Sequence, residues 1–194
     1  PVSAGSNATV WVAHGIPGAK VDVCVGGSAV KTDFRYGQKF KASLPAGSYT
    51  IRVRLAAHED CAGAVVIKQT VAVTSGLNAT AVAVVKNNTP QLAIYVNDTS
   101  GGSNVASISV IHEATAPAVD VWLAAPVRVA AIPAPTIEDL ERGDKVGPVF
   151  VGPDVYTYWV SLPGKAKPVI GPKVTNFVEG RAYTIIALGT DASN

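Results

Sequence analysis

The chain has 194 residues, of which 48% are hydrophobic and 15% are charged, and its formal net charge at pH 7 is +2. A charged fraction well below the roughly 25% of typical soluble proteins, combined with a low net charge, excludes intrinsic disorder. The chain has no local cluster of Lys and Arg that would favour nucleic acid. It also has no apolar stretch as long as a membrane span.

Alternating apolar and polar residues predict β-strands throughout the first half of the chain. The expected strands are 9–13, 21–25, 49–55, 65–73, 80–86 and 92–96. Gly-Gly at 26–27 and Pro-Ala-Gly at 45–47 mark tight turns between them. Residues 100–104, Ser-Gly-Gly-Ser-Asn, have the composition of a flexible linker.

The second half shows the same strand pattern, with one interruption. The expected strands are 106–111, 119–123, 155–161, 173–177 and 183–188. Between them, Pro135–Asp139 resembles a capping box, and Gly143 would end a helix, so one short helix is expected near 136–142. Short strands separated by Gly and Pro turns, without βαβ alternation, predict an all-β sandwich architecture.

The chain resembles itself at an offset of 98 residues. Residues 8–25 read ATVWVAHGIPGAKVDVCV and residues 106–123 read ASISVIHEATAPAVDVWL, so that His14 and Asp22 align with His112 and Asp120. Later segments also match, at a slightly larger offset that indicates an insertion in the second copy. The repeat predicts two tandem immunoglobulin-like β-sandwich domains, 1–99 and 105–194, joined by the linker.

Three segments carry a resemblance to a known family. VWVAHGIPGAKVDVCVGG, SLPAGSYTIRV and TSGLNATAVAVV resemble the bacterial and archaeal family of unknown function DUF4397. The segment QLAIYVNDTSGGSNVASISVIHEA resembles the usual link between consecutive copies in that family. The resemblance implies exported, surface-located repeat proteins and brings no enzymatic activity with it.

Cys24 and Cys61 are the two cysteines of the chain. In an exported protein they are expected to form one disulfide that closes a loop of 37 positions, whereas in a cytosolic protein they would be two buried thiols. The absence of Met, including at position 1, favours removal of a secretory leader and therefore export.

The repeated pairs His14/Asp22 and His112/Asp120 could orient a general base. No Ser or Cys nucleophile recurs beside both pairs, so each His is expected to bond a turn. Each Asp is expected to face away from the core or to fix a neighbouring loop. We therefore expect no enzyme, no catalytic residue and no cofactor, with a hydrolase as the weakest alternative.

Two polar clusters and a set of aromatic residues are further candidates. His58-Glu59-Asp60 is expected to be an exposed loop tip, and Glu138, Asp139 and Glu141 a solvated face, with metal binding as the alternative for each. No metal site is expected. A sugar-stacking surface is the alternative for the aromatic residues Trp11, Tyr36, Tyr95, Trp122, Tyr156, Tyr158 and Trp159.

Four asparagines stand in Asn-X-Thr sequons, namely Asn7, Asn78, Asn87 and Asn97. All four lie in or next to the first copy, and they predict an exported glycoprotein. Asn97 is expected to be the most exposed because it lies where a strand meets the linker. The alternative is coincidence in a Thr-rich β protein.

The second copy has no counterpart of the strand at 91–96, because six residues follow Leu188. We therefore expect a free sheet edge in the second domain, which residues 1–7 of a neighbouring molecule would cover. Such head-to-tail contact generates filaments. The expected function is an extracellular structural protein, a self-assembling subunit of a cell-surface filament or surface layer, with other surface proteins or glycans as further partners. The alternative is a monomeric adhesion or carbohydrate-binding module.

Overall fold

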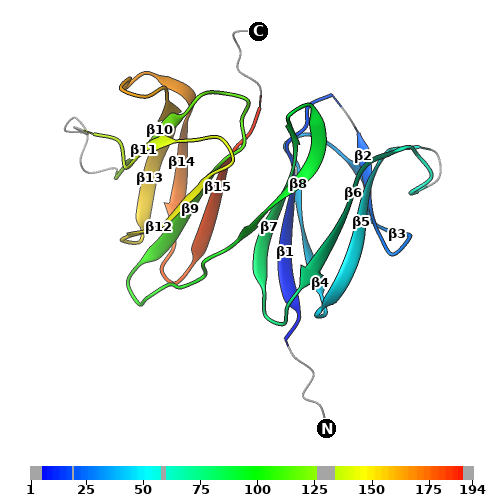
Figure 1. Ribbon diagram of the computed structural model, residues 1–194. Coiled ribbons are helices and arrows are strands. Elements are labelled where there is room, and N and C mark those ends of the chain that lie inside the picture. The colour runs from blue at the N-terminus through cyan, green and yellow to red at the C-terminus, as the bar shows by residue number, and fades with distance from the viewer. Residues whose placement is uncertain (1–5, 19, 58–59, 126–133, 190–194) are drawn as a thin grey trace. The chain divides into compact units, whose positions relative to one another are not determined.

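The computed structural model describes residues 6–18, 20–57, 60–125 and 134–189. Within these ranges the fold is all-β, with fifteen strands and no helix. The chain forms two compact units, Pro1–Asn97 (the first unit) and Asp98–Asn194 (the second unit), which Figure 1 shows in ribbon form. Within the described ranges no helix is long and apolar enough to cross a membrane.

The first unit consists of two four-stranded sheets, with the strand orders β4-β1-β7-β8 and β3-β2-β5-β6. Neighbouring strands are antiparallel, except for β1 and β7, which run parallel. The strands are β1 (Ala8–His14), β2 (Val21–Val25), β3 (Ser28–Phe34), β4 (Lys39–Leu44), β5 (Gly47–Leu55), β6 (Val65–Val73), β7 (Asn78–Lys86) and β8 (Thr89–Val96).

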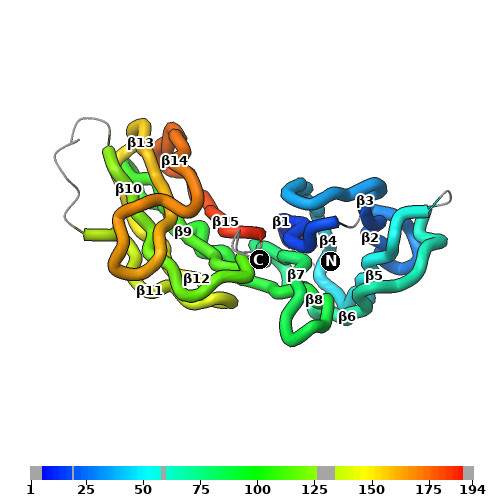
Figure 2. The backbone as a smooth tube through the Cα atoms, turned by 90° about the horizontal axis from the view of Figure 1, so that it is seen from above, coloured from blue at the N-terminus to red at the C-terminus, as the bar shows by residue number. Residues whose placement is uncertain are grey.

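The core of the first unit lies between its two sheets. Because successive side chains of a strand point to opposite faces, every second residue is directed inward. Val21, Val23 and Phe34 from one sheet thus pack with Ala83 and Leu92 from the other. Figure 2 shows β1 and β7 on one side of this core and β2 and β5 on the other. The first unit is therefore a two-layer β-sandwich.

The second unit repeats this plan with one strand fewer among its described residues. Its sheets have the orders β11-β10-β13-β14 and β12-β9-β15. The strands are β9 (Ala106–His112), β10 (Val119–Ala124), β11 (Ile137–Leu140), β12 (Lys145–Val151), β13 (Asp154–Ser161), β14 (Pro168–Phe177) and β15 (Ala182–Ala187). Here β9 and β15 form the parallel pair.

The pairing register defines which residues of the two units are equivalent. In the first unit Thr9 lies opposite Asn78, and in the second Ser107 lies opposite Ala182. Strand β15 is therefore the counterpart of β7. In the described part of the second unit no strand pairs with β15 in the position that β8 takes beside β7.

The predicted helix near 136–142 is wrong. Residues 137–140 form strand β11, which pairs with β10 and directs Ile137 and Leu140 into the core. A spacing of three residues places two side chains on the same face of a helix, which is why the sequence suggests one. In a regular strand the same spacing would place them on opposite faces, but the bulge in the β10–β11 pairing directs both into the core. Asp139 has φ +50, which a right-handed helix does not accommodate.

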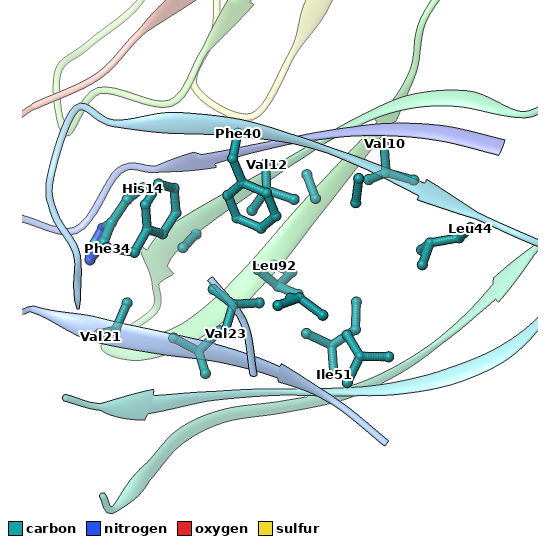
Figure 3. A pocket seen from close by; sticks show the side chains of 16 residues that line it. Val10, Val12, His14, Val21, Val23, Phe34, Phe40, Leu44, Ile51 and Leu92 are labelled. Atoms are coloured by element: carbon teal, nitrogen blue, oxygen red, sulfur yellow. The ribbon is translucent and has the colours of Figure 1, made fainter. Parts of the chain in front are cut away.

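The two cores differ in how completely they are filled. An apolar cavity of about 50 Å³ remains between the sheets of the first unit, and one of about 20 Å³ in the second. Side chains from both sheets point into the larger cavity, among them Val12, Phe40 and Ile51 (Figure 3). Ala81 lines this cavity, whereas its counterpart Ile185 carries a larger side chain into the other core. Ligand pockets usually measure about 300 Å³ or more, so the cavity is a packing defect.

Filling the larger cavity should stabilise the first unit. We predict that Ala81→Val raises the free energy of unfolding by about 1 kcal/mol, since cavities cost about 24 cal/mol per Å³. The reverse change, Ile185→Ala, should lower the stability of the second unit by about 2 kcal/mol or more. Denaturant unfolding measures both. Destabilisation by Ala81→Val would contradict the interpretation of this cavity as space that a larger side chain can fill.

Candidate functional site

Asp22 is a buried carboxylate on β2 that holds the end of strand β3 and one loop. It is 1% exposed. Its Oδ1 accepts a hydrogen bond from the backbone N–H of Asp33 at 3.1 Å, and its Oδ2 accepts one from the backbone N–H of Cys61 at 3.3 Å. Both donors have left-handed backbone conformations, with φ +51 and +62. The carboxylate thereby fixes the chain direction near the end of β3 and in the loop between β5 and β6.

Asp120 makes the same arrangement in the second unit, at 3% exposure. Its Oδ1 accepts from Asp139 N at 3.0 Å and its Oδ2 from Gly164 N at 2.9 Å. These donors also have left-handed conformations, with φ +50 and +66. Backbone N–H groups compensate the loss of water around a buried carboxylate. We call this arrangement the aspartate clamp.

An exposed ion pair lies beside the aspartate clamp of the first unit. The Asp33 side chain lies 2.7 Å from Lys20 Nζ, and both side chains are exposed. The hydrogen bond from Lys20 and its positive charge hold the pKa of Asp33 below its usual value. Because the pair is solvated, it contributes little stability. The structural contact is the partly buried hydrogen bond from Asp33 N to Asp22.

The two repeated histidines bond turns that follow their strands. His14 Nδ1 accepts a hydrogen bond from Ile16 N at 3.2 Å, and its ring packs against Phe34 with centroids 5.5 Å apart. His112 Nε2 lies 2.9 Å from the carbonyl oxygen of Pro117, to which it donates because a carbonyl only accepts. Both rings are buried. This geometry supports a structural role for the repeated His and Asp residues.

Cys24 and Cys61 form a disulfide, with their Cα atoms 6.1 Å apart. The predicted pairing is therefore present in the structure. The bond ties β2 to the loop that Asp22 also holds through Cys61 N. Closing a loop of this length contributes about 3–4 kcal/mol in the chain-entropy model.

A tryptophan pair takes the place of the disulfide in the second unit. Trp122 is the counterpart of Cys24, and it stacks on its cross-strand neighbour Trp159 with centroids 5.6 Å apart and planes 6° apart. Its Nε1 donates to Ser161 Oγ at 2.8 Å. An aromatic stack of this kind is worth about 0.5–1.5 kcal/mol beyond its buried area. The second unit thus fixes the same region without a covalent bond.

The other candidate residues do not form one site. No metal-holding group of three or more His, Cys, Asp or Glu residues occurs in the described ranges. His58 and Glu59 lie outside those ranges. Asp139 serves the aspartate clamp through its backbone. Tyr156 and Tyr158 pack against the core of the second unit and Trp122 is buried, so the aromatic residues of that unit do not form an exposed platform.

The four sequons differ in accessibility. The Asn97 side chain, expected to be exposed, is partly buried, with its Nδ2 donating to Asn78 Oδ1 at 2.8 Å and its Oδ1 accepting from Thr80 Oγ1 at 3.0 Å. Asn87 instead occupies the exposed two-residue turn between β7 and β8, with φ +50. Asn7 is also exposed.

One sheet edge lacks the protection that the others carry. The described residues form eight edge strands, β3, β4, β6, β8, β11, β12, β14 and β15. Seven of them contain a Pro or a charged residue, which hinders pairing with another chain. Strand β15, AYTIIA, contains neither. It is therefore the candidate interaction site of the described structure.

The fold and the clamps define a protein of tandem β-sandwich units, and comparison with known proteins agrees. A family model described as "Domain of unknown function (DUF4397)" matches residues 8–122. Because the match covers more than half of the chain, the protein belongs to this family. A search of the curated proteins found no match.

A solved structure of the Bacillus anthracis TIE protein shows a weak likeness. The sequence identity is 13% and the TM-score is 0.28, with 94% of this chain and 34% of that chain covered. The protein thus spans about a third of that chain's length. At this TM-score the likeness supports no structural conclusion.

The aspartate clamp makes a testable prediction. Asp120→Asn replaces one acceptor oxygen with an N–H₂ group that faces a backbone N–H, so we expect a loss of about 1–3 kcal/mol in the stability of the second unit. Asp144→Asn, at an exposed position, is the matched control and should change stability by less than about 0.5 kcal/mol. Equal effects of the two changes in denaturant unfolding would contradict the clamp.

Proposed function

We propose that the protein is an extracellular structural protein, a self-assembling subunit of a cell-surface filament or surface layer. The observation that supports this function best is the unprotected edge of β15. An exposed edge strand presents unpaired N–H and C=O groups and is a template for pairing with another chain. Natural proteins normally protect such edges, and each of the other seven edge strands among the described residues contains a Pro or a charged residue.

The buried polar residues support the same proposal. The repeated Asp and His side chains bond loops and turns of their own unit, which suits a scaffold. The disulfide favours an oxidising, extracellular location, since disulfides are rare in reducing compartments. Repeated units that associate through an edge of one and a different segment of the next generate open, linear assemblies.

Self-association tests this function. We expect the weight-average mass of the disulfide-intact chain in sedimentation experiments to rise with protein concentration to multiples of the single-chain mass. Electron microscopy of the concentrated sample should show linear or layered assemblies. A chain that stays at the single-chain mass over the whole range would contradict the proposal and favour the monomeric adhesion or carbohydrate-binding module.

Glycosylation is a second expected property of the exported protein. Of the four sequons, Asn87 lies at an exposed hairpin turn, whereas Asn78 and Asn97 are joined by a hydrogen bond between their side chains. In material from a cell that glycosylates sequons, we expect a glycan on Asn87, and Asn87→Gln should lower the intact mass by that glycan. Glycans confined to Asn78 and Asn97 would contradict this assignment.

A further inference from the structure

We propose that the outer face of β1 and β4 binds an acidic polysaccharide, a chain of sugar rings that carry carboxylate or sulfate groups. The site consists of Trp11, Lys39 and Lys41, which we call the aromatic-basic strip. This inference goes beyond the proposed function and does not depend on self-association. It follows from the direction and exposure of these side chains, from the charge of the first unit, and from the way in which the second unit differs at the same place.

The alternation along two paired strands places the strip on the outer face of its sheet. Val12 of β1 and Phe40 of β4 point into the space between the sheets (Figure 3). Successive side chains of a strand point to opposite faces, so Trp11, Lys39 and Lys41 point outward. Trp11 is the cross-strand partner of Lys41. Lys39 lies two residues from Lys41 on the same face of β4, at about 7 Å along the strand.

The strip is accessible, and its polar groups have no partner among the described residues. Trp11 is 40% exposed, and both lysine side chains are exposed. Within the described ranges, no carboxylate lies within ion-pairing distance of Lys39 or Lys41, and the indole N–H of Trp11 makes no hydrogen bond. An aromatic face and two ammonium groups are therefore available together to one ligand.

The charge of the first unit favours an anion as that ligand. Residues 1–97 contain nine Lys and Arg but four Asp and Glu, which gives a formal charge of +5. Residues 98–194 contain seven Lys and Arg and ten Asp and Glu, which gives −3. The formal charge of +2 of the whole chain thus conceals a basic first unit. Its field attracts anions, and the lysines of the strip lie within that unit.

The indole beside the lysines favours a sugar polymer over other anions. The face of an aromatic ring is negative and attracts C–H groups, which line the faces of a sugar ring. A lysine ammonium group binds carboxylate or sulfate oxygens as a point charge. Lys41 can therefore bind an acidic group of the sugar that packs on Trp11, and Lys39 can bind the next acidic group along the polymer. Nucleic acid is less suited, because its backbone requires an extended positively charged groove.

The second unit shows that the fold does not require the strip. Ser109 is the counterpart of Trp11, according to the register of the two parallel strand pairs. Opposite Ser109, strand β12 has a bulge that contains Gly147 in place of Lys41. A Cβ atom added to Gly147 would lie 2.9 Å from the Ser109 Cα atom, so this position has no room for a long side chain. The same strand pairing thus forms without the aromatic and basic side chains, and folding does not explain their presence in the first unit.

Four variants separate binding from the protection of an edge strand. Lys39 and Lys41 lie on the edge strand β4, where a charge of either sign hinders pairing with another chain. Lys41→Glu keeps a charge on the edge but reverses its sign, whereas Lys41→Arg keeps the sign. Lys68→Glu is the matched control, because it changes the net charge equally at an exposed position of β6 in the other sheet. Trp11→Ser removes the ring and introduces the residue that the second unit carries there.

The test is calorimetric titration of the disulfide-intact full chain and of each variant with polygalacturonate, dextran sulfate and neutral dextran. We expect the full chain to bind an acidic polymer but not neutral dextran, and the tighter of the two acidic polymers identifies the preferred acidic group. Lys41→Glu and Trp11→Ser should each weaken this binding by about tenfold or more. Lys41→Arg and Lys68→Glu should stay within about threefold of the full chain. Circular dichroism verifies that each variant is folded.

Four results would overturn the inference. The first is a full chain that binds neither acidic polymer. The second is equal weakening by Lys68→Glu and Lys41→Glu, which would mean attraction to the net charge alone. The third is unchanged binding by Trp11→Ser, which would mean that no sugar packs on the indole. The fourth is tighter binding of single-stranded oligothymidylate through the same residues, which would make nucleic acid the occupant. A full chain that binds the acidic polymer but stays monomeric would support this inference and contradict the proposed function alone.

Discussion

The pairing of backbone N–H and C=O groups at the parallel strand pair is the constraint on which the architecture depends. In each unit the second strand of that pair, β7 or β15, presents a row of backbone groups on its other side, and these groups bond either to a further strand or to solvent. In the first unit β8 pairs with β7 on this side. The side-chain amide of Gln69 on β6 also bonds both the N–H and the C=O of Leu92 on β8, which links the two sheets at this edge. The second unit closes its core with Tyr183 instead, which protects the apolar interior but leaves the backbone edge of β15 unpaired within the described residues.

A second constraint, the burial of one carboxylate per unit, explains why the repeat is recognisable. The aspartates of the two repeats, Asp22 and Asp120, each bond one backbone N–H group of an edge strand, β3 or β11, and one of a loop. The donor segments differ in sequence between the units, yet each contributes a residue with positive φ. The disulfide and the tryptophan pair then stabilise the same region by different chemistry. The repeated polar residues are therefore explained by folding, and the open edge is the feature that folding leaves unexplained.

The sequence predicted the family, the all-β class and the disulfide, because apolar alternation, the repeat and an even cysteine count are local signals. It missed β3 and β4, since Lys31, Asp33, Lys39 and Lys41 give these edge strands the polarity of loops. It misread β11 because a spacing of three between Ile137 and Leu140 suits a helix as well as a bulged strand. The partners of Asp22 and Asp120 could not be predicted, since the donors are backbone groups distant in sequence. The immunoglobulin-like assignment stays a prediction.

The account makes the outward amides of β15 the contact between subunits, and hydrogen exchange measures those amides directly. Exchange in the peptide that covers Ala182–Ala187, read by mass spectrometry in dilute and in assembled samples, is the decisive measurement. The amides of Ala182, Thr184 and Ile186 should become protected on assembly, while the edge strands β4 and β14 keep their exchange rates. Assembly that leaves β15 unchanged and protects another edge would contradict the account.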